Sequence, residues 1–147
     1  AELTTAIFAE ANLQDAILKG ANLRETDLSK CQLQRANLRS ANLRAANFKN
    51  ANLQDAILQQ VTAIESNFQA ANLSGADVRG ADLHAAQLNA VNFQAARLMG
   101  ADLQDANLHS ASLVDTDLRG TCLKGVLHNE QTVWPDDFDA TLVRGIG

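Results

Sequence analysis

The chain has little of what an irregular globular protein uses to fill its interior. Aromatic residues make up 4% of its 147 residues, tyrosine is absent, and proline and tryptophan each occur once. No apolar run approaches the roughly 18 residues that a membrane-spanning helix needs, and no secretory signal is visible. The scarcity of large side chains favours a narrow, repeated interior of Leu and Ala, which is typical of a repeat protein.

An excess of charge of one sign is also missing. The net charge is −5, and residues 1–125 carry 11 Lys and Arg against 13 Asp and Glu. Residues 126–147 carry four Asp and Glu against Arg144, which gives the remaining net charge of −3. Binding to phosphate backbones needs a clear basic excess. The near-neutral segment therefore predicts no nucleic-acid partner, and it is equally poor material for imitating a nucleic acid.

What the sequence does have is a five-residue period that runs through residues 1–125 without a change of phase. The central residue of each unit, at positions 3, 8, 13 and so on to 123, is Leu in 19 of 25 units. The residue two positions earlier is Ala in 18 units, and the residue between them is Asn or Asp in 15. A period of five fits neither a helix nor a long strand. It predicts short extended pieces, each followed by a turn that Gly at the last position favours.

A longer period of twenty is superimposed on the period of five. Glycines, basic residues and glutamines recur at multiples of twenty, as Gly20, Gly80, Gly100 and Gly120, Lys19, Arg39, Arg79 and Arg119, and Gln14, Gln34, Gln54 and Gln94. Four units per coil account for all three columns. The sequence therefore predicts an all-β solenoid of about six four-sided coils, stacked at the inter-strand spacing of about 4.8 Å.

The units resemble those of the pentapeptide-repeat proteins, particularly cyanobacterial and thylakoid-lumen members. The pattern Ala-(Asn/Asp)-Leu-x-x stands at residues 21–25, 41–45 and 81–85. The resemblance implies a right-handed quadrilateral β-helix, and the hand comes from the resemblance alone. The run Thr-x-Trp-Pro-x-x-Phe-Asp at residues 132–139 also resembles the C-terminal segment of many cyanobacterial members.

Two regions depart from the pattern. In residues 61–65 the central residue is the small Ala63 in place of the usual Leu, and the residue two positions earlier is the larger Val61 in place of the usual Ala. Either Val61 fills the volume that Ala63 leaves, or Ile64 turns inward through a bulge. Residues 126–147 abandon the repeat, and we expect them to form a short C-terminal cap in which Trp134 and Phe138 cover the last coil. An open solenoid end exposes apolar side chains and unpaired strand edges, which such a cap would cover.

No residue set in the sequence points to catalysis, a cofactor or a metal. Cys31 and Cys122 fall about four and a half coils apart, too far for a disulfide, and we expect both to be structural thiols. His84, His109 and His128 share no metal-ligand spacing and are expected at the surface. The absence of a nucleophile–base group or a phosphate loop predicts that the protein is not an enzyme.

The most suggestive surface is the side of the coil that carries the glycine column. It combines basic and outward apolar residues, as interfaces often do, although most such stripes are ordinary solvated faces. The candidate partner surface is Ile17, Lys19, Arg39, Ile57, Arg79, Arg97, Met99 and Arg119. On the opposite side we expect an inert ladder of glutamine amides along the stack.

The sequence therefore favours a non-catalytic structural scaffold or protein-interaction rod with an unknown protein partner, as a monomer or a weak end-to-end dimer. The resemblance suggests an alternative, because some relatives inhibit DNA gyrase by mimicking DNA. Those relatives have a strongly acidic surface and pair through a C-terminal helical module, and this chain departs from them on both points.

The compartment depends on what precedes the chain. It starts at Ala1, within a repeat and without an initiator Met, so we expect an upstream segment. If that segment is a signal peptide, the periplasm or the thylakoid lumen is favoured over the cytoplasm.

Overall fold

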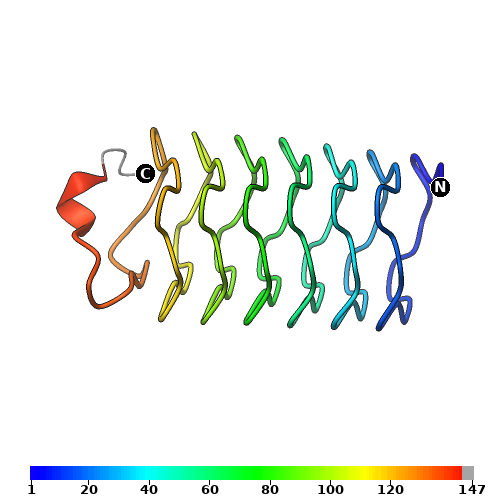
Figure 1. Ribbon diagram of the computed structural model, residues 1–147, viewed down its shortest axis with the longest axis horizontal. Helices are drawn as coiled ribbons and strands as arrows, with labels where there is room; N and C mark the ends of the chain where they lie inside the picture. Colours follow the sequence, from blue (N-terminus) through cyan, green and yellow to red (C-terminus); the bar gives the residue numbers. More distant parts are fainter. Residues whose placement is uncertain (144–147) are drawn as a thin grey trace.

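The computed structural model describes residues 1–143 and shows an elongated stack of coils, with the N-terminal units at one end and residues 126–143 at the other (Figure 1). Parallel β-bridges join residues twenty apart, such as Asn22 to Asn42 and Asn42 to Thr62. Each coil therefore has four five-residue units, as predicted, and the chain is an all-β solenoid. We number the sides by the units of the first coil: residues 1–5, 6–10, 11–15 and 16–20 begin the first to fourth sides.

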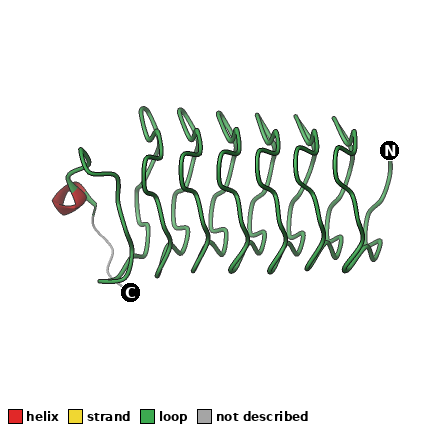
Figure 2. Ribbon diagram, turned by 90° about the horizontal axis from the view of Figure 1, so that it is seen from below, coloured by secondary structure: helices red, strands yellow, loops and turns green. Residues whose placement is uncertain are grey.

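Each side contributes an isolated bridge residue rather than a strand of several residues, so the coils appear as loops in Figure 2. Within residues 1–143 the one helix is η1, a 3-10 helix of three residues, Ala140–Leu142. Its N-cap is Asp139, whose carboxylate accepts a hydrogen bond from the Thr141 N–H at 3.0 Å.

The coils are joined by the same three backbone hydrogen bonds on nearly every side. On the first side, Asn42 N–H donates to Ala21 at 2.9 Å, Leu23 N–H donates to Asn42 at 2.8 Å, and Glu25 N–H donates to the carbonyl of Arg44 at 2.9 Å. One coil alone makes none of these bonds. Stability therefore depends on stacking, as in other solenoids.

A tight turn follows each extended piece. The carbonyl of the central residue accepts a hydrogen bond from the N–H three residues later, as in Leu18 to Ala21 at 3.0 Å. The last residue of every unit in residues 1–125 has a positive φ, and 19 of these 25 residues are not glycine. The sequence predicts that Gly, with Asn or Asp nearby, supplies this conformation; the structure extends it to Ala, Ser, Thr, Glu, Gln, Lys and Arg. Such a φ at the third turn residue fits a type II turn.

The interior is a column of central Leu and Phe side chains flanked by Ala. Almost all of these residues are buried between coils two and six, and the rings of Phe48 and Phe68 stack with their centroids 4.7 Å apart. Ala fits beside them because four large side chains per coil leave little room in the square interior.

Residues 61–65 form a regular unit. Thr62 bridges both Asn42 and Asp82, as its neighbours in the column do. Val61 and Ala63 are 1% and 0% exposed, whereas Ile64 remains on the outer wall, partly exposed. Of the two alternatives, the structure has the one in which Val61 compensates for the volume that Ala63 lacks.

The register continues briefly beyond residue 125. Leu127 bridges Asn107, and after one inserted residue Val133 bridges Ser112. At the insertion the Asn129 side chain replaces a backbone carbonyl, because its Oδ1 accepts the Ser110 N–H at 2.9 Å.

The segment after Val133 carries two aromatic rings, those of Trp134 and Phe138, near the C-terminal end of the stack. Trp134 packs against the core and stacks on Phe138, with ring centroids 4.8 Å apart. Phe138 also packs against the core, so the two rings contact both each other and the interior of the rod.

Candidate functional site

The predicted partner surface lies on the fourth side of the rod. Its eight residues all belong to units that begin at residues 16, 36, 56, 76, 96 and 116, and they occupy outward positions. Ile17 is 84% exposed and Ile57 36% exposed. We call this set the fourth-side stripe.

The centre of the stripe is organised by Asp77. Its Oδ1 accepts a hydrogen bond from Arg79 Nε at 2.8 Å, and its Oδ2 accepts from Arg79 Nη2 at 2.7 Å and from Gln59 Nε2 at 2.6 Å. Arg97 Nη1 lies 3.7 Å from the same Oδ2. These donors, Arg79 above all, lower the pKa of the Asp77 carboxyl from 3.8 to about 2, because they stabilise its charged form.

The C-terminal part of the stripe repeats this arrangement. Arg119 forms the same two-point contact with Asp117, with Nε to Oδ1 at 2.9 Å and Nη2 to Oδ2 at 2.7 Å. Its Nη2 also donates to Met99 Sδ at 3.0 Å. The hydrogen bonds from Arg119 hold the pKa of Asp117 below its ordinary value.

The stripe therefore divides into two parts of different character. Arg79, Arg97 and Arg119 all lie within 4 Å of aspartates on their own side. Lys19 and Arg39 form no ion pair within residues 1–143. Sequence reasoning placed all five cations in one set and missed the pairing, although the spacing Asp-x-Arg at residues 77–79 and 117–119 signals it.

The Asn and Asp residues at the outward bridge positions serve the scaffold. In all 15 units that have one, its Oδ1 accepts the N–H two residues later, at 2.9–3.3 Å. This Asx-turn contact shapes the turn of each unit. It explains the strong preference for Asn and Asp at this position.

The glutamine column differs from the prediction in two ways. Gln34 belongs to the unit directly before that of Arg39, so the column lies on the third side, adjacent to the stripe rather than opposite it. Gln34 Nε2 donates to Gln32 Oε1 at 2.9 Å within its own unit. Within residues 1–143 no hydrogen bond joins two glutamines of the column. The predicted amide ladder was wrong.

The cysteines take the positions expected of them. Cys31 is buried, its Sγ donates to the Phe8 carbonyl at 2.8 Å, and burial raises the pKa of its thiol. Cys122 is exposed.

One of the three histidines departs from the predicted surface position, whereas His84 and His109 lie on the outer wall, partly exposed. His128 does not lie on the outer wall, because it takes a central position in the last coil, where its ring meets Trp134 edge-on with centroids 5.6 Å apart. The Nε2 atoms of His109 and His128 are both enclosed. Residues 1–143 contain no group of three His, Cys, Asp or Glu side chains placed to hold a metal ion.

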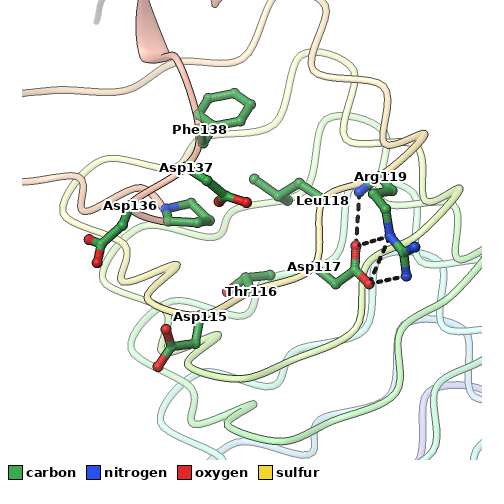
Figure 3. Close-up of a pocket in the computed structure, with 9 residues that line it drawn as sticks. Asp115, Thr116, Asp117, Leu118, Arg119, Asp136, Asp137 and Phe138 are labelled. Carbon is green, nitrogen blue, oxygen red and sulfur yellow. Dashed lines mark hydrogen bonds and ion pairs between the residues drawn. The ribbon is translucent and has the colours of Figure 1, made fainter.

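A cavity of about 670 Å³ lies at the C-terminal end of the fourth side (Figure 3). Residues 115–119 form one wall and residues 135–138 the other. Sequence reasoning did not find it, because its second wall depends on the path of the segment after the repeat.

The repeat units match a known protein family. The family profile described as pentapeptide repeats matches with eight copies, at residues 6–44, 46–84 and 86–125, which is more than half of the chain. The chain belongs to the pentapeptide-repeat family. The resemblance inferred from its units is thereby confirmed.

Solved pentapeptide-repeat proteins share the fold. Alr5209 from Nostoc PCC 7120 is 36% identical, with 65% of this chain and 79% of that chain covered and a TM-score of 0.64. HetL from the same cyanobacterium, which is involved in heterocyst differentiation regulation, is 27% identical over 93% of this chain and 78% of that chain, with a TM-score of 0.57. AT2G44920 from the Arabidopsis thaliana thylakoid lumen resembles the chain in sequence, at 29% identity with coverages of 74% and 66%, but its TM-score of 0.31 does not show a shared fold.

No curated protein matches the sequence. In the part of the chain that the structure describes, no helix has the length and apolar character needed to cross a bilayer.

Proposed function

We propose that this pentapeptide-repeat protein is a non-catalytic scaffold that binds a protein partner through the N-terminal half of the fourth-side stripe. The observation that carries the proposal is the combination of Ile17 and Ile57, both exposed, with Lys19 and Arg39, which no aspartate of residues 1–143 pairs. Exposed apolar side chains beside available cations are the composition of a protein-binding patch.

The rest of the rod supports a scaffold role. The interior is filled by Leu, Phe and Ala, and the outward Asn and Asp side chains are bound to their own backbone. We further propose about six right-handed coils in residues 1–125, closed by the C-terminal segment with Trp134 and Phe138 over the end; residues 144–147 of the predicted cap lie outside the described residues. The rod acts as a monomer or a weak end-to-end dimer, without a nucleic-acid partner. If the full protein carries a signal peptide, its compartment is the periplasm or the thylakoid lumen.

The test is charge reversal with a matched control. The variant Lys19→Glu/Arg39→Glu changes the stripe, and Lys30→Glu/Lys49→Glu makes the same change of charge on the second side, opposite the stripe. Each protein is immobilised and used to recover partners from native extract, and circular dichroism checks that both variants keep the fold. Loss of a partner from the stripe variant alone supports the proposal. Equal recovery by the stripe variant and the unchanged protein overturns it.

DNA mimicry with binding to gyrase is the alternative function. The near balance of charge in residues 1–125 does not favour it. A supercoiling assay distinguishes the two, because clear inhibition of gyrase by the unchanged protein would replace the scaffold proposal.

A further inference from the structure

The last unit of the fourth side, residues 116–120, leaves a backbone edge without a following coil. One coil earlier the same positions are paired: Asp117 N–H donates to the Ala96 carbonyl at 3.0 Å, Leu98 N–H donates to the Asp117 carbonyl at 2.9 Å, and Gly100 N–H donates to Arg119 at 3.1 Å. The equivalent groups of the last unit form no hydrogen bond within residues 1–143. They are the Thr116 carbonyl and the N–H groups of Leu118 and Gly120.

The C-terminal segment passes beside this edge without pairing to it. The cavity of about 670 Å³ separates residues 115–119 from residues 135–138. Figure 3 shows the Leu118 side chain directed from its wall towards Asp137 of the other, with Phe138 above. The space next to the edge is therefore open, and Leu118, Pro135 and Phe138 give it an apolar lining.

The rim of the cavity is acidic. Asp115, Asp117, Asp136 and Asp137 line it, against a single cation, Arg119, which is bound to Asp117. Carboxylates gathered around an apolar space favour a ligand that is basic and partly apolar.

The rod itself contains an extended segment, residues 96–98, that pairs with the preceding coil as a partner segment would pair with this edge. Arg97 stacks one coil after Asp77, with Nη1 3.7 Å from Oδ2, and its neighbours Ala96 and Leu98 point into the core. A strand added after Asp117 would place its outward residue over that carboxylate, as Arg97 lies over Asp77. Its two flanking side chains would face Leu118 and the cavity.

We propose that the edge of residues 116–120 binds an extended basic segment of a partner protein by β-strand addition. The segment runs parallel to residues 116–120 and has the pattern small apolar, Arg or Lys, large apolar. Its backbone takes the three hydrogen bonds that the next coil would have made, and this main-chain pairing supplies affinity while the side chains supply specificity. The site lies at the other end of the side from Lys19 and Arg39, so it goes beyond the proposed function and can fail independently of it.

The probe is a fluorescein-labelled peptide with the sequence of residues 94–100, Gln-Ala-Ala-Arg-Leu-Met-Gly, titrated with the full chain and followed by fluorescence anisotropy. We expect saturable binding. Replacing the peptide's Arg by Glu weakens it about tenfold, since an attraction becomes a repulsion. Replacing that Arg by Pro abolishes binding, because the N–H that reaches the Thr116 carbonyl is lost.

Two protein variants locate the site. Asp117→Asn keeps the Asx-turn oxygen and removes the charge, and we expect about threefold weaker binding. Asp102→Asn is the matched control on the first side, since Asp102 makes the same turn contact with Gln104, and it leaves binding unchanged. Amide hydrogen exchange gives the structural readout: the peptide slows exchange at Leu118 and Gly120.

Absence of binding overturns the proposal, as does binding that Asp117→Asn and the Glu-containing peptide leave unchanged. Slow exchange at Leu118 and Gly120 without peptide also overturns it. Such protection at every protein concentration would assign the edge to residues 144–147 of the chain, and protection that rises with concentration would assign it to a second copy.

Discussion

Asp77 holds Arg79 at two points, with Nε 2.8 Å from Oδ1 and Nη2 2.7 Å from Oδ2, although only one residue separates them in sequence. Both side chains point outward from the same side of the coil, on either side of the central Val78. The pair fixes the guanidinium against the wall of the rod, and Arg119 repeats the arrangement with Asp117. The fourth side is thus less basic in practice than its sequence suggests.

The pairing predicts a specific dependence of stability on pH. The pKa of Asp77 falls from 3.8 to about 2 in the folded state. A lowered pKa means that the ionised carboxylate stabilises the fold, and this contribution is complete above pH 4 and is lost as the pH falls towards 2. We expect Asp77→Asn to lower the free energy of unfolding by up to about 1 kcal/mol at pH 6, since the pair is partly exposed.

The difference between Asp77→Asn and the unchanged protein should shrink as the pH falls from 4 to 2 and vanish below pH 2. Urea denaturation at several pH values measures it, with Glu65→Gln, an exposed residue without an ion pair in residues 1–143, as the control. A difference that stays constant from pH 6 to pH 2 would show that the carboxylate's charge is not responsible.

The positive φ at the last position of each unit predicts that Ala85→Gly stabilises the rod. Ala85 has φ +56°, which costs an L-residue about 1–2 kcal/mol, whereas glycine adds about 0.4–1 kcal/mol of unfolded-state entropy. The expected net gain is about 0.5 kcal/mol, measured by urea denaturation. Ala86→Gly is the matched control; Ala86 is buried and its substitution should destabilise. A loss of stability in Ala85→Gly would contradict the role given to φ.

The volume compensation in residues 61–65 predicts that Ala63→Leu is neutral or destabilising, by up to about 3 kcal/mol, because the interior around Ala63 is already filled. The double variant Val61→Ala/Ala63→Leu restores the common Ala-x-Leu pattern and should recover most of the loss. Thermal unfolding compares the two. A clear rise in melting temperature for Ala63→Leu alone would mean that Val61 does not fill the missing volume.

The stacked rings at the C-terminal end predict a role in closing the rod. Trp134→Ala/Phe138→Ala should cost about 2–4 kcal/mol and promote self-association, because it uncovers apolar side chains and coil edges. Sedimentation velocity and thermal unfolding measure both effects. Leu142→Ala is the control, since Leu142 is 77% exposed. A double variant that stays monomeric with unchanged stability would remove the cap from the account.

The fold follows from the sequence because each coil repeats the same local rule. The alternation of Ala and Leu around an outward residue determines which side chains enter the interior, and the twenty-residue columns determine the number of sides. The Asx-turn contact was harder to predict from the sequence. The preference for Asn and Asp was visible, but the N–H that their side chains bind, two residues later, depends on the backbone geometry of the turn.

The surface was harder to predict than the core. The prediction that Lys19, Arg39 and Arg79 lie in one column was correct. The sequence did not show that Arg79 forms an ion pair with Asp77 whereas the other two form none; the distances in the structure show it. His128 was misassigned because the residues after 125 still follow the coil, which places it at a central position. The cavity beside Leu118 depends on where residues 135–138 turn, and no periodic pattern encodes that path.

The central claim is that a protein partner contacts the fourth side of the rod. The most direct measurement is photo-crosslinking in native extract, with a benzophenone amino acid placed either at Ile57, on the fourth side, or at Gln87, on the second side. Both residues occupy outward, exposed bridge positions. We expect a protein adduct from position 57 and none from position 87. Equal adducts from both positions, or none from position 57, would contradict it.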